Sequence, residues 1–160
     1  MVRDERPGDR GAIRDIVTAA FGRSDEADLL DGLRHDGDCV FSLAAFDGAA
    51  PVGHIALSRL AAPFRALAMA PVSVVPERQR RGIGSLLIEA ALERAARARW
   101  QAVFVLGAPD FYRRFGFDPA LARGFASPHA GPHLMARVLE APLPVSTGRI
   151  DYAPAFARLR

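Results

Sequence analysis

A glycine turn at residues 79–85 has the residue types and spacing of a phosphate-binding site. It reads Gln79-Arg-Arg-Gly-Ile-Gly-Ser85, follows an apolar run and opens an amphipathic one. A helix N-terminus offers free backbone N–H groups and a positive dipole end, and glycines let an anion approach the backbone closely. Arg78, Arg80 and Arg81 are near enough in sequence to pair with phosphate oxygens. The segment predicts a pyrophosphate cradle, and the structural alternative is an ordinary tight turn with solvated arginines.

Two other glycine loops are excluded by the residues present. A P-loop requires Gly-Lys-Ser/Thr, which is absent from this chain, and the dinucleotide fingerprint requires a third glycine where Leu87 stands. A nucleotide ligand has little support, because neither a lysine nor a nearby acidic metal ligand accompanies the turn.

Hydrophobic periodicity predicts the elements that must position this turn. They are a strand at 1–4, a helix after Asp9, a helix after Ser24 or Asp25, strands at about 40–46 and 52–60, a strand at 66–75, a helix at 83–98 and a strand at 102–106. The last three form a right-handed strand–helix–strand unit, so the fold class is α/β with a mixed sheet. Pro71 lies inside the strand at 66–75 and predicts a bulge there.

A second cluster, Phe111-Tyr-Arg-Arg-Phe-Gly-Phe117, follows the strand at 102–106. The Gln-x-x-Gly-x-Gly turn resembles the coenzyme A signature of the GNAT superfamily of N-acetyltransferases. The aromatic-Tyr-x-x-x-Gly-Phe segment resembles the second hallmark of that superfamily. With the Arg6-Pro-Gly-Asp9 helix start, Val52-Gly-His54 and the segment from Gly148 to Phe156, the chain is similar to the YhbS-like branch over nearly its full length.

The resemblance implies an architecture and a set of binding residues. The expected fold is a mixed central sheet of about six to seven strands flanked by about four helices, with the fourth and fifth strands splayed apart at a bulge. Acetyl-CoA is the implied cosubstrate, and the Val74 N–H would face the thioester carbonyl. The implied cofactor-binding residues are Val72, Ser73 and Val74 along the pantetheine arm, and Gln79, Arg80, Arg81, Gly82, Ile83, Gly84 and Ser85 around the pyrophosphate.

Tyr112 is implied as the general acid beside the cofactor sulfur. A thiol titrates near ~8.5 and a phenol near ~10, so a tyrosine is able to hydrogen-bond and protonate a leaving thiolate. The structural alternative is a core aromatic. An attacking amine with a pKa near ~10.4 must lose a proton first, and residues 66–75 contain no carboxylate. A water chain or His54 is left as the proton acceptor, although a lone histidine on a strand is often structural.

The expected function is direct transfer of an acetyl group from acetyl-CoA to a primary amine of a small molecule or peptide, in a ternary complex. A non-catalytic acyl-CoA-binding module that acts on a protein partner is the alternative. The missing strand carboxylate keeps this alternative open.

Composition sets the remaining expectations. With 160 residues, half of them apolar, the chain is expected to be a single domain, 1–160, with residues 140–160 extended or irregular. The net charge of +3 and the scattered arginines argue against nucleic-acid binding. A lone cysteine, Cys39, and the lack of a long apolar run predict a cytoplasmic protein with no membrane association. His129 and His133 are separated by Gly131 and Pro132, so no metal site is expected, and Arg149–Phe156 is a candidate dimer edge.

Overall fold

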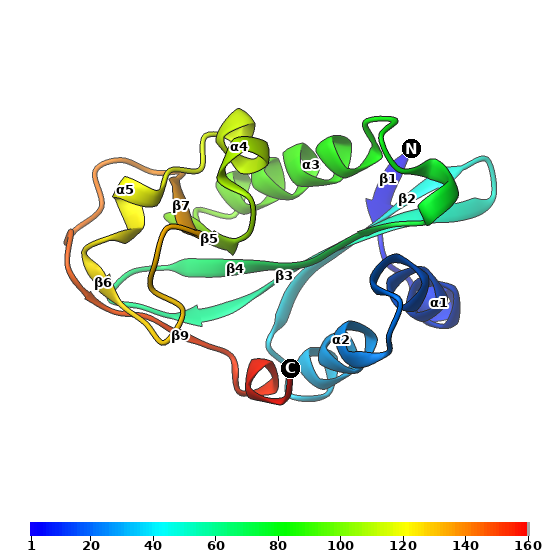
Figure 1. Cartoon of the computed structure of the whole chain (residues 1–160), viewed down its shortest axis with the longest axis horizontal. Helices are drawn as coiled ribbons and strands as arrows, with labels where there is room; N and C mark the ends of the chain where they lie inside the picture. The colour runs from blue at the N-terminus through cyan, green and yellow to red at the C-terminus, as the bar shows by residue number, and fades with distance from the viewer. Residues whose placement is uncertain (160) are drawn as a thin grey trace.

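Seven strands form one mixed sheet in a computed structural model that describes residues 1–159 (Figure 1). The order is β1-β2-β3-β4-β5-β7, and β9 pairs with β3 beyond this path. Within this sheet, as far as residues 1–159 show it, only β4 and β5 are paired in parallel, which confirms the predicted mixed sheet. The strands are β1 (Val2–Asp4), β2 (Cys39–Asp47), β3 (Ala50–Ala61), β4 (Ala66–Val74), β5 (Ala102–Leu106), β7 (Leu134–Val138) and β9 (Asp151–Tyr152).

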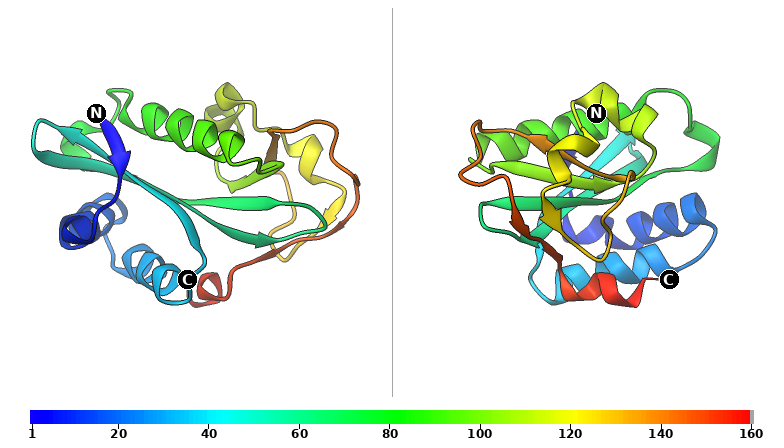
Figure 2. Two further views of the ribbon diagram at one scale, coloured as in Figure 1. Left: turned by 180° about the vertical axis from the view of Figure 1, so that it is seen from behind. Right: turned by 60° about the vertical axis from the view of Figure 1, so that its left-hand side comes forward.

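Helices cover both faces of this sheet (Figures 1 and 2). Helices α1 (Arg10–Phe21) and α2 (Asp25–His35) lie on one face, and α3 (Ile83–Arg97) lies on the other. The short helix α4 (Pro109–Tyr112) continues into the 3-10 turn η3 (Arg113–Phe115). The remaining helical pieces are η1 (Pro7–Asp9), η2 (Pro76–Arg78), α5 (Pro119–Ala122) and η4 (Pro154–Arg158). No helix within residues 1–159 has both the length and the apolar character needed to span a bilayer.

The splay between β4 and β5 creates an opening in the sheet. Their parallel pairing covers three residues on each strand, from Ala66 opposite Ala102 to Ala68 opposite Phe104. On the other side of β4, the register with β3 shifts so that two residues, Ala70 and Pro71, oppose one. This is the predicted bulge at Pro71, and beyond it β4 runs on to Val74 without β5 as a neighbour.

Close packing of α3 against β3 fixes where the helix begins. Gly53 makes this possible, because a Cβ atom there would lie 3.0 Å from Cδ1 of Leu87 and 3.1 Å from Cγ2 of Ile83. Both of these side chains come from α3. The missing Cβ lets the first turns of the helix rest directly on the strand, which holds the preceding glycine turn at the sheet's edge.

The C-terminal region combines short paired strands with the 3-10 helix η4. Strand β8 (Gly148–Arg149) pairs with β6 (Phe125–Ala126), and β9 pairs with the end of β3 through Tyr152 opposite Leu60. The segment offered as a dimer edge therefore pairs within the chain's own sheets at these residues.

A buried polar cluster lies under α1 and α2, on the sheet face opposite α3. His54 is fully buried on β3, and its Nε2 atom lies 2.7 Å from Oγ of Ser42 and 3.9 Å from Oε1 of Glu5. The carboxylate of Glu5 is paired with Arg34, whose Nε atom donates to Oε2 at 3.1 Å. Burial, and secondarily the nearby charge of Arg34, lowers the pKa of His54 to about 3. Its imidazole is neutral near pH 7.

Replacing His54 with Gln should flatten the acid side of the stability profile. The pKa of His54 is about 3 in the folded chain, against ~6.5 in an unfolded one. The unfolded state therefore binds more protons between these values, so the stability present above pH ~6.5 is lost as the pH falls. Urea unfolding at pH 4–7 should show the wild type losing up to about 1.4 kcal/mol per pH unit more than His54→Gln. Parallel profiles for the two proteins would contradict this assignment.

Candidate functional site

The glycine turn forms a concave array of backbone N–H groups at the start of α3. Arg80 has φ 65° and Gly82 has φ 84°, so two residues of the turn are left-handed. Left-handed residues alternating with right-handed ones turn successive N–H groups toward one point, which is an anion-binding geometry. Gly82 is the N-cap of α3, and the first turn of that helix contains no acidic residue. The positive end of the helix dipole is therefore not offset by a carboxylate there.

A pocket of about 290 Å³ opens at this turn. The end of β4 provides one wall, the start of α3 a second and the α4 region a third. The lining residues are Val74, Arg78, Gln79, Arg80, Gly82, Ile83, Gly84, Ser85, Phe111 and Arg114. Of the predicted cofactor-binding residues, Arg81, Val72 and Ser73 do not line it.

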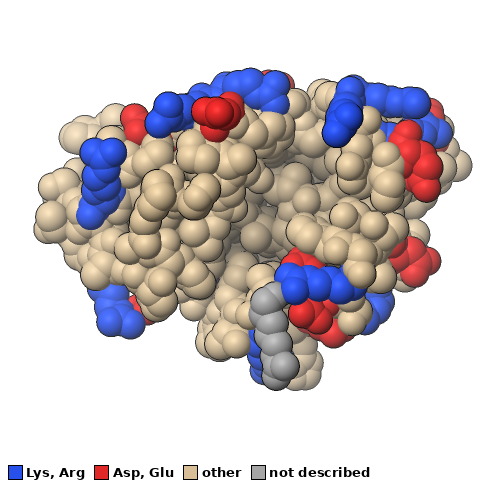
Figure 3. All heavy atoms as spheres, viewed as in Figure 1, with Lys and Arg blue, Asp and Glu red and all other residues tan. Residues whose placement is uncertain are grey.

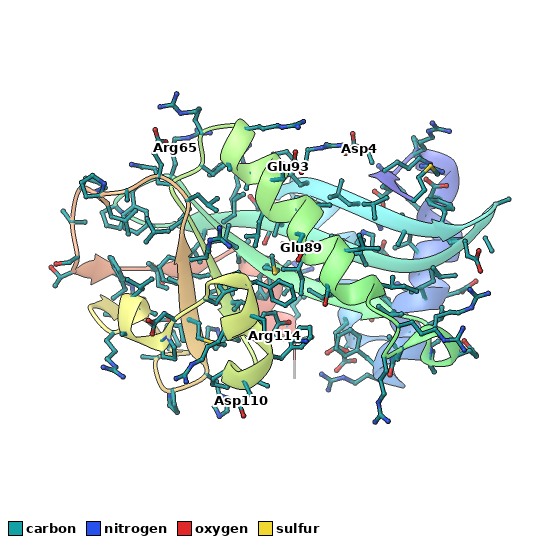
Figure 4. The ribbon with its side chains drawn as sticks, turned by 90° about the horizontal axis from the view of Figure 1, so that it is seen from above. Asp4, Arg65, Glu89, Glu93, Asp110 and Arg114 are labelled. Carbon is teal, nitrogen blue, oxygen red and sulfur yellow. The ribbon has the colours of Figure 1, made fainter. Side chains whose placement is uncertain are left out.

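Arg114 and Phe111 also line this pocket, although neither was expected from the sequence to bind the cofactor. The Arg114 guanidinium lies 4.6 Å from the ring centroid of Phe111 and donates from Nε to the Phe111 carbonyl oxygen at 3.3 Å. Figure 4 shows Arg114 at the α4 side of the gap between α4 and α3. In the sequence, their position within the aromatic segment at 111–117 is the feature that could have indicated a place in this pocket.

Two side chains brace the turn against the sheet. Gln79 donates from Nε2 to the Val74 carbonyl oxygen at 3.1 Å, and Arg78 forms an ion pair with Asp47 of the β2–β3 hairpin. The amide of Gln79 is therefore engaged with the protein backbone. This bond gives Gln79 a role in the Gln-x-x-Gly-x-Gly signature, because it holds the cradle at the end of β4.

Strand alternation decides which backbone groups of β4 face the splay. Val75 donates its N–H to the Val52 carbonyl oxygen at 2.9 Å. In an antiparallel ladder, this bond directs the backbone groups of Ser73 toward β3 and those of Val72 and Val74 to the opposite side. That side is the splay, because β5 is paired with β4 only as far as Ala68. The backbone groups of Val72 and Val74 thus face the splay, whereas those of Ser73 face β3, and contact of these residues with the pantetheine arm stays a prediction.

Tyr112 is held in place by a close contact with a glycine. A Cβ atom on Gly107 would lie 2.4 Å from Cε2 of Tyr112, so the ring occupies the space of the missing side chain. Phe111 and Phe117 meet the same ring edge-on, with centroids 5.0 Å and 5.8 Å away. Burial raises the pKa of the Tyr112 phenol. The hydroxyl is therefore protonated at neutral pH and able to donate its hydrogen.

The structure does not bring His54 and Tyr112 together. Tyr112 packs against the core on the α3 face of the sheet. On β3, Gly53 faces α3, so its neighbour His54 faces the opposite side, where α1 and α2 lie. His54 is paired across the strands with Ser73, and within residues 1–159 its Nδ1 atom and the Ser73 hydroxyl both lack a hydrogen-bond partner.

A hollow lies in the middle of the face that Figure 1 presents, between the α4 side and the α1 side (Figure 3). Charged side chains lie around its rim, and its interior is formed by uncharged residues. Residues 1–159 contain no group of three or more His, Cys, Asp or Glu side chains able to hold a metal ion. His129 packs against Tyr152, with ring centroids 5.0 Å apart, and His133 hydrogen-bonds the Gly107 carbonyl oxygen at 3.1 Å.

Sequence comparison relates the chain to known acetyltransferases. The model of the acetyltransferase (GNAT) family matches residues 10–117. A protein of Escherichia coli K12 named as the uncharacterized N-acetyltransferase YjhQ is 37% identical over 134 residues, which cover 78% of this chain and 73% of YjhQ. The uncharacterized N-acetyltransferase YhbS of the same strain is 28% identical over 165 residues, covering 99% of both chains.

Solved structures agree with this relationship. The crystal structure of Escherichia coli YhbS in complex with CoA superposes with a TM-score of 0.93 at 27% identity, covering 100% of this chain and 93% of YhbS. A GNAT-family acetyltransferase from Brucella melitensis in complex with acetyl-CoA superposes with a TM-score of 0.84 at 31% identity, covering 98% of this chain and 97% of the other. The mixed sheet with its parallel β4–β5 pair is the fold that these matches share. This chain belongs to the GNAT family of acetyltransferases.

Proposed function

We propose that this chain transfers the acetyl group of acetyl-CoA to a primary amine by direct attack in a ternary complex. The observation that carries the proposal is the anion cradle at the start of α3, which opens at the same end of the sheet as the β4–β5 splay. Similar proteins have been solved with CoA and with acetyl-CoA bound. The cradle would hold the pyrophosphate, and the splay would admit the pantetheine arm.

The residues at the splay have distinct roles in the proposed reaction. Acetyl-CoA supplies a thioester that is activated toward attack. The Val74 N–H would stabilise negative charge on the carbonyl oxygen, a contribution that is about 3 kcal/mol for oxyanion donors in other enzymes. As the amine nitrogen bonds to the carbonyl carbon and the carbon–sulfur bond breaks, Tyr112 would give its proton to the departing thiolate. The phenolate is then reprotonated from solvent.

Removal of the amine proton falls to water in this proposal. Strand β4 contains no carboxylate, and His54 has a pKa of about 3. His54 is also fully buried on the sheet face opposite Tyr112, so an amine at the splay would not reach its imidazole. Of the two acceptors expected from the sequence, water chain and His54, the geometry favours the water chain. His54 then has a structural role, because its Nε2 atom lies 2.7 Å from Oγ of Ser42 in the buried cluster beneath α1 and α2.

A non-catalytic module that binds acyl-CoA and a protein partner is the second candidate. Two observations favour it, namely that β4 has no carboxylate and that the imidazole of His54 is buried and weakly basic. In either case we propose that residues 1–160 act as one acyltransferase-type domain in the cytoplasm. The lone thiol of Cys39, whose pKa is raised to about 11 chiefly by burial, fits a reducing compartment. Homodimer formation stays a prediction.

Replacing Tyr112 with Phe tests the proposed acid directly. The ring packing is kept while the proton donor is lost, so kcat should fall about 10²- to 10⁴-fold, with the Kd for acetyl-CoA unchanged. Thiol release from acetyl-CoA, measured over a panel of primary amines, checks the rate, and calorimetry checks binding. An unchanged kcat would make Tyr112 a core aromatic. Binding by the wild type with no thiol release from any amine or peptide would favour the second candidate.

Replacing Gly107 with Ala should displace Tyr112 without touching the cradle. The new Cβ would lie 2.4 Å from the ring, so the phenol must move. A misplacement of about 1 Å in a catalytic group is able to lower a rate by about 10²-fold, and we expect such a fall in kcat with acetyl-CoA affinity retained. Gly11→Ala is the matched control, because no atom lies within 4 Å of its added Cβ. Equal rates for the two variants would argue against placing Tyr112 in the reaction.

A further inference from the structure

A second pocket, of about 500 Å³, lies on the other side of α4 from the cradle. It is bounded by α4, by α5 and by the loop at residues 130–132. Its floor is Leu134, which is buried and pairs with Leu106 at the end of β5. The lining residues are Pro109, Arg113, Pro119, Ala122, Arg123, Ala130, Gly131, Pro132 and Leu134. No residue is shared with the cradle.

The charge of this second pocket is entirely positive. Among residues 1–159, Arg113 and Arg123 are its only charged lining residues, and both are exposed. Neither forms an ion pair or a side-chain hydrogen bond with any residue from 1 to 159. Most of the other arginines are paired, as Arg94 is with Asp4 at 2.7 Å. Other exposed arginines among residues 1–159, such as Arg59 and Arg158, are also unpaired, but here two unpaired guanidinium groups line one cavity.

The two carboxylates that neighbour this pocket in the sequence, Asp110 and Asp118, are not part of its lining. Asp118 is used as the N-cap of α5, where its Oδ1 atom accepts the Ala120 N–H at 2.8 Å. Figure 4 shows Asp110 at the outer edge of α4. Neither carboxylate lines the second pocket. A planar guanidinium binds carboxylate and phosphate groups through paired hydrogen bonds, so two of them favour a ligand with such a group.

The other walls are apolar and stiff. Three prolines, at positions 109, 119 and 132, line the pocket together with alanines and the buried Leu134. Proline restricts the backbone, so the shape of this cavity is largely set before a ligand arrives. An anion that also carries a hydrocarbon body would contact both the guanidinium groups and these walls.

Helix α4 places the second pocket beside the proposed reaction centre. Phe111 and Arg114 face the cradle, Pro109 and Arg113 face the second pocket, and Tyr112 lies between them in the chain. We propose that the second pocket binds a carboxylate or phosphate group of the acceptor, so that the acceptor is an amine carrying an anion. This inference rests on the proposed function. The anionic group would anchor one end of the acceptor while its amine reaches the thioester beyond α4.

The anion site can be tested without any catalysis. The probes are 4-phenylbutyrate, phenyl phosphate and the neutral 4-phenylbutanamide, observed by saturation-transfer NMR. Measurements use a Gly84→Trp background, in which the indole fills the cradle and prevents anions from binding there. We expect an anionic probe to bind at least tenfold more tightly than the amide, since one charge-assisted hydrogen bond contributes about that factor. Comparison of the carboxylate with the phosphate identifies which group the site takes.

Variants assign any binding to the two arginines. The Arg113→Gln, Arg123→Gln double variant should lose at least tenfold in affinity for the anionic probe. The control, Arg59→Gln, Arg158→Gln, removes two exposed arginines elsewhere and should not change it. Equal binding of the amide, no binding of either anion, or equal losses in both double variants would overturn the proposal.

A matched pair of amines extends the test to the acceptor. In the wild-type protein, kcat/KM for L-phenylalanine should exceed that for L-phenylalaninamide, and the Arg113→Gln, Arg123→Gln variant should lose this preference while keeping its KM for acetyl-CoA. The same comparison of O-phosphoethanolamine with ethanolamine covers the phosphate. A preference for the neutral amine in both pairs would overturn the acceptor assignment. Failure of the wild type to bind acetyl-CoA would instead contradict the proposed function. The NMR test of the anion site does not use acetyl-CoA, so its result would still stand.

Discussion

The end of β4–β5 pairing after Ala68 is the constraint on which the rest of the site depends. Two residues at the bulge, Ala70 and Pro71, oppose one residue of β3, and this redirects the second half of β4. No strand pairs with this side of β4 beyond the bulge. The backbone groups of Val72 and Val74 therefore face an opening, where a regular sheet would have the hydrogen bonds of a neighbouring strand. A continuous sheet would satisfy these groups internally and would leave no space for a cofactor arm between the strands.

The surrounding contacts keep that opening aligned with the anion cradle. Gly53 lets α3 rest on β3, Gln79 ties the turn to the Val74 carbonyl, and Arg114 closes the far wall from the α4 region. The cradle contains left-handed backbone at Arg80, a conformation that costs about 1–3 kcal/mol for a residue with a side chain. Strain of this size, held by the neighbouring contacts, fits a turn whose shape is selected for binding.

Local patterns in the sequence were sufficient to predict much of this arrangement. The glycine turn, the helix after it and the bulge at Pro71 are each determined by residues close together in the sequence. Hydrophobic periodicity and residue type were therefore enough to predict them. The role of Arg114 could not be predicted, because its pocket joins two elements about thirty residues apart in the sequence. The direction in which Ser73 faces could not be predicted either, because it depends on the β3–β4 register. The protonation of His54 is set chiefly by burial and secondarily by Arg34, and its neighbour Glu5 is also distant in the sequence. Such long-range contacts cannot be read from one sequence.

Calorimetric titration with acetyl-CoA tests the central claim most directly, using the wild type, Gly84→Trp and the matched control Gly11→Trp. Gly84 lines the cradle, whereas Gly11 lies on the exposed side of α1 with open space around it. The account predicts micromolar binding by the wild type and the control, and loss of binding in Gly84→Trp. Absence of binding by the wild type, or undiminished binding by Gly84→Trp, would contradict the placement of acetyl-CoA at this turn.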